Sequence, residues 1–331
     1  MNLNLQTSYM GLSLNSPLVV SACPLSEKVE NIAKMEDMGA GAVVLFSLFE
    51  EQLRKENELD EQIFASTADI FPEAASYFPD LDEYRVGTEK YLEIIRKAKE
   101  RVDIPIIASL NGITDEGWID YSKQMEQAGA DALEINIFYI PADIELSALA
   151  VENRYIDIVK KVRNTVDLPI AVKLNPYFSS MGNMALKLEK AGANALVLFN
   201  RFYQPDFDVT RLEVLSNLEY SHANELRLPL LWISLLYGKL QASLAATTGV
   251  QGALEVIKYL LAGADVAMTA SALYKHGIKA LHSMKHDLMV WMEQMGFKSI
   301  DDFKGIMSQQ KVADPTAFER ANYIRILETS G

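Results

Sequence analysis

VDLPIAVKLNPYF, residues 166–178, is the stretch from which the fold can be predicted. Its residues 170–172 form an apolar run that follows Pro169, a pattern typical of a strand buried on both faces. Lys173 ends the run, and an ammonium there needs a partner because an unpaired buried charge is costly. Lys173 therefore either forms a salt bridge across the rim of a barrel or points at an anionic group of a ligand.

A weak internal repeat surrounds this stretch. In each unit a helix ends at a glycine and a short apolar strand follows. The units are MEDMGAGAVVLFS (35–47), MEQAGADALEIN (125–136), LEKAGANALVLFN (188–200) and LLAGADVAMTAS (260–271). Glycine suits the left-handed position just past a helix end. A second phrase, VDIPIIASLNG (102–112), matches 166–176 and also leads from a helical stretch into a strand.

Eight strands separated by helices result when SPLVVSACP (16–24) and QASLAATTGV (241–250) are added. This alternation predicts a parallel sheet in an α/β protein. We expect a closed (β/α)8 TIM barrel over about residues 17–283. A doubly wound sheet that binds a dinucleotide would show a glycine fingerprint after the first strand, and SACPLSE has none.

One domain is expected over residues 1–331, with two regions outside the repeat. Residues 50–87 are long for a connection and contain the aromatic, acidic run FPEAASYFPDLDEY, which suits a flap over the barrel mouth or a surface decoration. Residues 284–331 are expected to form C-terminal helices beyond the barrel. Ser299 with Asp302 resembles a capping box, and Asp314 before Pro315 suits another helix start.

Composition narrows the classes of function. The formal net charge of −14 argues against a nucleic-acid partner, and the longest apolar runs, such as 228–237, are too short to cross a bilayer. The single cysteine, Cys23, and an N-terminal stretch without the features of a secretory signal lead us to expect a cytoplasmic protein. The four histidines follow no metal-ligand spacing, so no metal site is predicted. A homodimer is one option for the assembly, which the sequence leaves open.

Polar or small residues stand at the carboxyl ends of the predicted strands, the face where barrel enzymes keep their chemistry. They are Ala22, Ser47, Asn111, Asn136, Lys173, Asn200, Thr248, Gly249, Ala270 and Ser271. The small residues close the last two strands, where a barrel commonly holds a phosphate on backbone N–H groups. With amides and a central lysine that can stabilise negative charge, the set suits flavin mononucleotide, FMN. Alternatively, the asparagines only cap the helices that follow.

The chain resembles the FMN-dependent dihydroorotate dehydrogenases, particularly their soluble class 1, from NSPLVVSA (15–22) to SALYKHG (271–277). TTGV (247–250) resembles the family's double-glycine phosphate turn, and TASAL (269–273) its isoleucine-glycine-threonine strand end. The resemblance implies that Lys173, in VKLNPYF, contacts the flavin. The further cofactor residues that it implies are Ala22, Ser47, Asn111, Asn136, Thr248, Gly249, Ala270 and Ser271. It also implies that Asn136 and Asn200 bind the substrate.

Departures from the family pattern lie mostly on the substrate side. Phe46 stands where the family has a lysine before the serine of the second strand. After the fourth predicted strand, Tyr139 replaces the cysteine or serine base, and Pro141 replaces a substrate-binding asparagine. Residues 50–87 contain no convincing counterpart of the family's asparagine in the loop over the substrate. The cofactor site is therefore expected to be kept and the substrate pocket to be rebuilt.

Family chemistry passes a hydride to the flavin while a base removes the neighbouring proton, and the resemblance puts Tyr139 in the position of that base. A phenol has an unperturbed pKa of about 10, so it acts more readily as an acid, which would suit a reductase. Alternatively, Tyr139 only packs under the flap.

Three functions remain open. One is a dihydroorotate dehydrogenase, which oxidises dihydroorotate to orotate in pyrimidine biosynthesis. Another is a paralogous flavin oxidoreductase that acts on a different small substrate, and the third is a flavin-binding protein without turnover. A tRNA-reducing flavin barrel would be a further relative, but the net charge of −14 counts against it.

Overall fold

A computed structural model describes residues 3–49, 87–112, 115–201, 204–215 and 219–318, together with residue 328. The expected flap over residues 50–87 lies outside the described residues, apart from Gly87 at its end.

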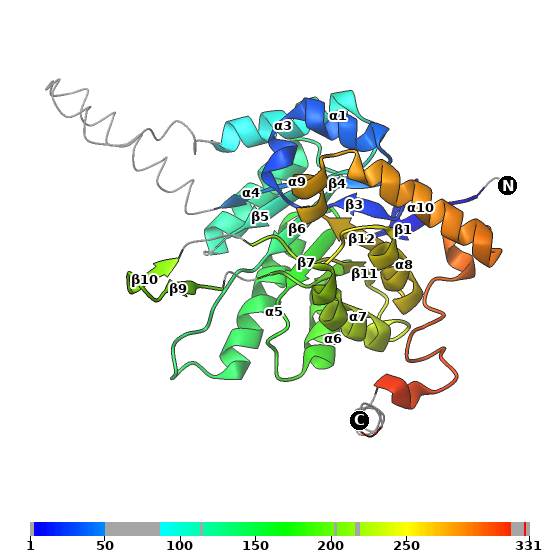
Figure 1. The fold of residues 1–331 in the computed structure, drawn as a ribbon. Helices are drawn as coiled ribbons and strands as arrows, with labels where there is room; N and C mark the ends of the chain where they lie inside the picture. The colour runs from blue at the N-terminus through cyan, green and yellow to red at the C-terminus, as the bar shows by residue number, and fades with distance from the viewer. Residues whose placement is uncertain are drawn as a thin grey trace, which may run out of the picture.

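Eight parallel strands close into a barrel, so the predicted (β/α)8 TIM barrel is confirmed (Figure 1). In order around the barrel they are β3 (Leu18–Val20), β4 (Ala42–Phe49), β5 (Ile106–Asn111), β6 (Ala132–Asn136), β7 (Ile170–Leu174), β8 (Ala195–Leu198), β11 (Ser243–Ala246) and β12 (Val266–Thr269). The pairing of β12 with β3 closes the ring.

Helices lie between the strands along the chain and surround the barrel (Figure 1). They are α1 (Val29–Asp37), α3 (Thr88–Arg101), α4 (Asp115–Gln127), α5 (Ala148–Thr165), α6 (Met181–Ala191), α7 (Arg227–Leu236) and α8 (Ala253–Ala262), with the 3-10 turns η1 (Pro24–Glu27) and η4 (Ala223–Leu226) before α1 and α7. The glycines of the repeat follow α1, α4, α6 and α8, and all four have positive φ angles: Gly39, Gly129, Gly192 and Gly263. The repeat therefore marks helix-to-strand turns, as predicted.

An N-terminal hairpin closes one end of the barrel. β1 (Thr7–Tyr9) pairs antiparallel with β2 (Leu12–Leu14), and Tyr9 is fully buried among the inward side chains of the strands. The backbone N–H of Met10 donates to the hydroxyl of Ser243, at the start of β11, over 3.1 Å. The hairpin thus lies at the amino ends of the strands and leaves the carboxyl ends for a functional site.

Beyond β12 the chain forms helices outside the barrel. They are α9 (Ser271–His276), α10 (Ala280–Met295) and the 3-10 turns η5 (Ile300–Asp302) and η6 (Pro315–Phe318). The predicted capping box is present at η5, where the Asp302 carboxylate accepts the backbone N–H of Ser299 over 2.8 Å. Among the described residues, no helix combines the length and apolar character needed to span a membrane.

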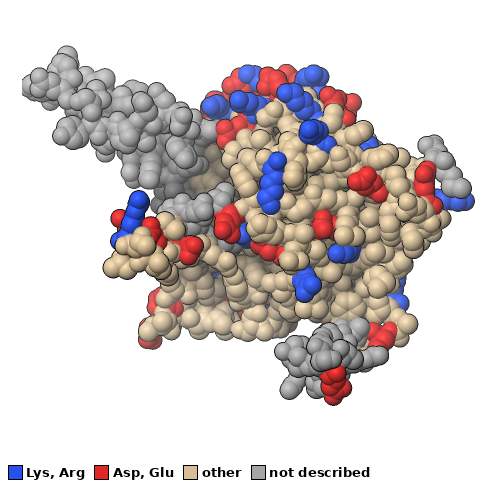
Figure 2. Space-filling view, in the orientation of Figure 1, with Lys and Arg blue, Asp and Glu red and all other residues tan. Residues whose placement is uncertain are grey.

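Two surface features stand out in the views of the molecule. Strands β9 (Asp206–Asp208) and β10 (Glu213–Leu215) form a hairpin that projects from the barrel after β8 (Figure 1). Over α1 and α3, lysine and arginine side chains alternate with acidic ones and do not form one basic patch on the visible face (Figure 2).

Candidate functional site

Polar side chains from neighbouring strands meet inside the carboxyl end of the barrel. The register pairs Asn136 of β6 with Lys173 of β7, and both residues are buried. The Asn200 amide, just beyond β8, donates to the side-chain oxygen of Asn136 over 2.8 Å. Three of the residues predicted from the strand ends therefore lie together.

Lys173 contacts a carboxylate that the strand-end pattern did not include. Its Nζ lies 3.5 Å from Oε1 of Glu134, two residues before Asn136 on β6. Only 10% of the Lys173 side chain and 1% of the Glu134 side chain are exposed. A salt bridge was one expected alternative, and it is present, but inside the barrel rather than across its rim.

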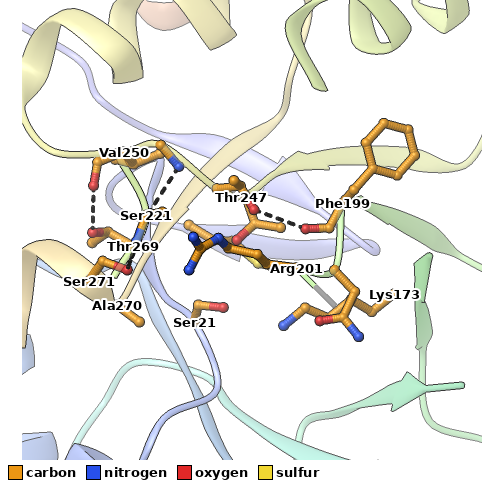
Figure 3. Close-up of a pocket in the computed structure, with 14 residues that line it drawn as sticks. Ser21, Lys173, Phe199, Arg201, Ser221, Thr247, Val250, Thr269, Ala270 and Ser271 are labelled. Carbon is orange, nitrogen blue, oxygen red and sulfur yellow. Dashed lines mark hydrogen bonds between the residues drawn. The ribbon is translucent and has the colours of Figure 1, made fainter. Parts of the chain in front are cut away.

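A cavity of about 130 Å³ extends from Lys173 to the turns that follow β11 and β12 (Figure 3). Most of the predicted cofactor and substrate residues line it. They are Lys173, Asn200, Thr248, Gly249, Ala270 and Ser271. The predicted phosphate residues and the predicted ring contact thus border one continuous space.

The turn after β11 has a backbone shape that only glycine fits at one position. Thr248 and Gly249 both have positive φ angles, of 77° and 79°. A Cβ on Gly249 would lie 2.7 Å from the backbone nitrogen of Leu226, which is too close for unstrained packing. The Gly249 N–H donates to the hydroxyl of Ser221 over 3.3 Å. The turn is therefore held close to the segment before α7.

Ser221 joins the two turns, and the sequence pattern missed it. Its hydroxyl and its backbone N–H lie 3.1 and 3.2 Å from the Ser271 hydroxyl. The Lys275 ammonium donates to the Ser221 carbonyl oxygen over 2.9 Å. Ser221 lies in the long connection between β8 and α7, where no periodicity marks a position, so only the fold brings it to the site.

Arg201 is a second residue that the sequence pattern missed, although it directly follows Asn200. Its side chain lines the cavity beside both turns, and Figure 3 shows the guanidinium extending into this space. Its Nε donates to Oε2 of Glu225 over 2.8 Å, and about a third of its side chain is exposed. A cation three residues after the end of β8 is the signal that could have identified it.

A second cavity, of about 680 Å³, shares Arg201, Ala270 and Ser271 with the first. Its other walls include the predicted cofactor residue Ala22 and several apolar or aromatic side chains: Cys23, Pro24, Phe138, Pro205, Tyr220 and Tyr274. The rings of Tyr220 and Tyr274 stack with centroids 5.2 Å apart. Burial raises the pKa of the Cys23 thiol to about 11, so this cysteine stays protonated near neutral pH.

A family model described as dihydroorotate dehydrogenase matches residues 4–292, from the N-terminal hairpin into α10. This chain belongs to the dihydroorotate dehydrogenase family. The catalytic subunit of dihydroorotate dehydrogenase B (NAD(+)) from Thermoplasma volcanium is 27% identical over 316 residues, covering 92% of this chain and 98% of that protein.

Two further relatives widen the comparison. The corresponding catalytic subunit from Pyrococcus abyssi is 25% identical over 309 residues, or 91% of this chain and 98% of that one. Dihydroorotate dehydrogenase A (fumarate) from Lactobacillus delbrueckii subsp. bulgaricus is 27% identical over 209 residues, or 62% and 68%. The chain is thus a dihydroorotate dehydrogenase-like oxidoreductase of the kind that acts on CH–CH groups.

Phe46, at the dihydroorotate dehydrogenase family's lysine position, turns away from the barrel interior. It is 8% exposed, and its ring meets that of Tyr91 on α3 edge-on, with centroids 5.0 Å apart. The β4–β5 register shifts between Val44 and Ser47, and such a bulge changes the direction of the side chains that follow. Ser47 consequently meets Ser109 of β5, with the hydroxyl oxygens 2.8 Å apart.

Tyr139 also lies apart from the other predicted residues. Its ring packs under the guanidinium of Arg154 on α5, 4.3 Å from the centroid, and it lines neither the first nor the second cavity. Its neighbour Phe138 lines the second cavity instead. The geometry therefore joins Asn136, Lys173 and Asn200 but does not bring Tyr139 to them.

Asn111 and Ser47 occupy the part of the barrel end formed by β4 and β5. Asn111 is buried, at 4% exposure, and lies opposite Phe49 at the end of β5. Within the described ranges, no three histidine, cysteine or acidic side chains come together as a group able to hold a metal ion.

Proposed function

We propose that this chain is an FMN-dependent oxidoreductase whose substrate is a small molecule other than dihydroorotate. The observation that carries the proposal is the continuous lining from the buried Lys173 to the turns of Gly249 and Ser271. Its polarity suits a ligand with a planar ring at one end and a phosphate at the other, and the adjoining second cavity adds room for the ring.

The donors at the two turns fit a phosphate. Gly249 has no side chain where a Cβ would collide with Leu226, so this turn can pack closely against η4 while it borders the cavity. Hydroxyls of Ser221 and Ser271 and the guanidinium of Arg201 border the same space. Backbone N–H groups, hydroxyls and a planar cation are the groups that commonly bind phosphate.

The opposite end of the cavity fits the polar edge of a flavin ring. Asn136 and Asn200 offer amide donors and acceptors, and Lys173 offers a buried positive charge. When bound there, FMN would supply the acceptor for a hydride. Lys173 would then stabilise the negative charge that develops at the ring edge, which is more effective in a site that excludes water.

The substrate side supports a substrate other than dihydroorotate. Phe46 replaces a cation and packs against Tyr91, so it offers nothing to a carboxylate. Tyr139 lies under Arg154, and this contact favours a packing role over the role of a base. Each lost ion pair or buried hydrogen bond costs about 1–3 kcal/mol, and about 1.4 kcal/mol is tenfold in affinity.

The second cavity suggests what the substrate carries. Phe138 and the stacked Tyr220 and Tyr274 offer apolar and aromatic surface, while Arg201 is the cation that this cavity shares with the first. The lining also includes Gln204 and the acidic Asp206 and Glu219, so a small unsaturated or cyclic compound that makes both apolar and polar contacts fits it.

The proposal is tested first through the cofactor. Purified protein is expected to be yellow and to release FMN on denaturation, identified by chromatography against FAD and riboflavin. Colourless protein that fails to take up added FMN would contradict it. Screening cyclic and α,β-unsaturated compounds for anaerobic bleaching or reoxidation of the bound flavin then identifies the substrate class.

The same flavin-reduction assays can identify the electron acceptor. Relatives are named for NAD(+) or fumarate, so NAD(+), NADH and fumarate are the first co-substrates to test. A role in pyrimidine biosynthesis would follow only if dihydroorotate proved to be the substrate. The expected cytoplasmic location and homodimer stay predictions.

A further inference from the structure

The buried Glu134 contacts Lys173 from below the site through one of its two carboxylate oxygens. Glu134 is fully buried, and its Oε1 lies 3.5 Å from the Lys173 ammonium. Its second oxygen, Oε2, has no hydrogen-bond partner among the described residues. A carboxylate held in this way contributes its charge to the surroundings without the hydrogen bonds that would normally offset its burial.

The negative charge of Glu134 extends through the barrel interior. The phenol oxygen of Tyr9 is buried below the site and likewise has no hydrogen-bond partner among the described residues. Burial and the charge of Glu134 together raise the pKa of this phenol. Because the interior is lined by buried apolar side chains, a charge there is only weakly screened.

Stability alone gives little reason for this pair. A buried ion pair replaced by apolar residues of similar volume often leaves a protein equally stable or more stable. Removing one partner, by contrast, leaves an uncompensated charge, so the two residues act as a unit. Lys173 lines the first cavity and Glu134 does not, so Glu134 acts on a ligand by holding the Lys173 ammonium in place and by its own weakly screened charge.

We propose that Glu134 is a positioning residue that holds the Lys173 ammonium at the end of β7 and offsets part of its positive charge. The site then presents less than a full positive charge to the ring of the bound cofactor. Glu134 thereby keeps the reduction potential of the flavin lower than Lys173 alone would set it. This inference rests on the proposed FMN function.

The test is the flavin reduction potential of the holoenzyme, measured against a reference dye at neutral pH. Glu134→Gln keeps the shape of the side chain but removes its charge, so Lys173 acts undiminished. At a fixed dye potential, the ratio of reduced to oxidised flavin is expected to rise about tenfold. For a two-electron couple this is a shift of about 30 mV to higher potential.

Three companion variants separate this effect from a structural one. Lys173→Met should lower the potential, and Glu134→Gln should raise it less in the Lys173→Met background than in wild type, because only the direct effect of the Glu134 charge is left there. Glu134→Asp keeps the charge, so its flavin reduction potential should stay close to that of wild type. Glu152→Gln removes a carboxylate from another ion pair, with Lys187 between α5 and α6, and should change nothing.

The proposal is overturned if Glu134→Gln leaves the potential unchanged or lowers it, or if it acts equally with and without Lys173. A failure of the proposed function would look different, because wild-type protein would then bind no FMN. In that case the pair is tested by thermal unfolding of the unliganded protein. In a double-mutant cycle, the losses in free energy of unfolding caused by Glu134→Gln and by Lys173→Met should add up to more than the loss caused by both changes together.

Discussion

The two sides of the barrel mouth differ in whether their side chains line the cavity or pack away from it. On the side of β11 and β12, the turns of Gly249 and Ser271 line the first cavity, and Ser221 joins them. On the side of β4, Phe46 packs on Tyr91, away from the barrel interior. We propose that the family pattern is kept where it would hold a cofactor and replaced where it would hold dihydroorotate.

This contrast indicates that one set of residues would bind the cofactor and another would select the substrate. Backbone N–H groups and close glycine turns hold a phosphate whatever reaction follows. Side chains that grip a particular substrate can change without disturbing those turns, since the β4 bulge and the β11 turn lie on different strands. The predictions below test each side separately.

The largest effect is expected for Phe46→Ala on the substrate side. Removing this buried aromatic side chain should lower the free energy of unfolding by about 3–5 kcal/mol. Affinity for FMN should stay within about twofold, provided that the variant is studied well below its melting temperature. Urea unfolding and FMN titration measure the two quantities.

Phe207→Ala is the matched control, because Phe207 lies on the projecting hairpin and is 63% exposed. It should change the free energy of unfolding by less than about 0.5 kcal/mol. If Phe46→Ala instead weakened FMN or substrate binding without loss of stability, Phe46 would have to be assigned to the site.

Gly249→Ala is the next largest, on the cofactor side. The added methyl group would collide with Leu226, and the new alanine would have to keep a φ of +79°. This strain costs about 1–3 kcal/mol. Affinity for FMN should fall about tenfold or more, as measured by fluorescence titration of the unliganded protein. Gly129→Ala is the control: it has a φ of +95° but nothing within 4 Å, so only stability should fall. Equal loss of FMN affinity in both variants would point to a general folding defect.

Arg201→Gln tests whether Arg201 binds the phosphate of FMN. Loss of one charge-assisted hydrogen bond costs about 1.5–3 kcal/mol, so FMN should bind about tenfold more weakly. Riboflavin, which lacks the phosphate, should lose little affinity, and this difference distinguishes phosphate binding from a structural role. Arg211→Gln removes a guanidinium that is 76% exposed on the β9–β10 hairpin and should change neither affinity.

The smallest effect is expected for Tyr139→Phe. The aromatic ring that packs under Arg154 is kept, and only the hydroxyl is removed. Turnover of the true substrate should stay within about twofold of wild type, because a group outside both cavities does not carry the proton. Loss of turnover with FMN still bound would restore Tyr139 as the catalytic acid or base.

Sequence reasoning predicted the barrel because its signals are local. Glycine ends a helix at Gly39 and at Gly192 alike, and each apolar run that follows becomes a barrel strand. Lys173 and Asn136 were predicted for the same reason, since a polar residue after a buried strand must lie at the barrel end. The order of strands and their register then bring the two together.

Residues that depend on distant segments could not be predicted in this way. Ser221 reaches Ser271 across 50 residues, and Glu134 meets Lys173 across 39, so neither has a neighbour in sequence that indicates its role. The outward direction of Phe46 depends on a bulge in β4, which the alternation of side chains does not reveal. A single inserted residue decides whether a strand residue faces a substrate or a helix.

The most direct test of the account is the anaerobic reduction of the bound flavin by dihydroorotate, followed by stopped-flow absorbance. Lactobacillus delbrueckii dihydroorotate dehydrogenase A, a named relative, serves as the positive control. The resemblance implies that at least two side chains that would grip dihydroorotate are replaced here, and each replacement should cost about 1–3 kcal/mol of binding free energy. The second-order rate constant should therefore be at least about thirtyfold below that of the control, with FMN nevertheless bound at one per chain. Reduction as fast as in the control would contradict the claim that the cofactor side is kept while the substrate side is rebuilt.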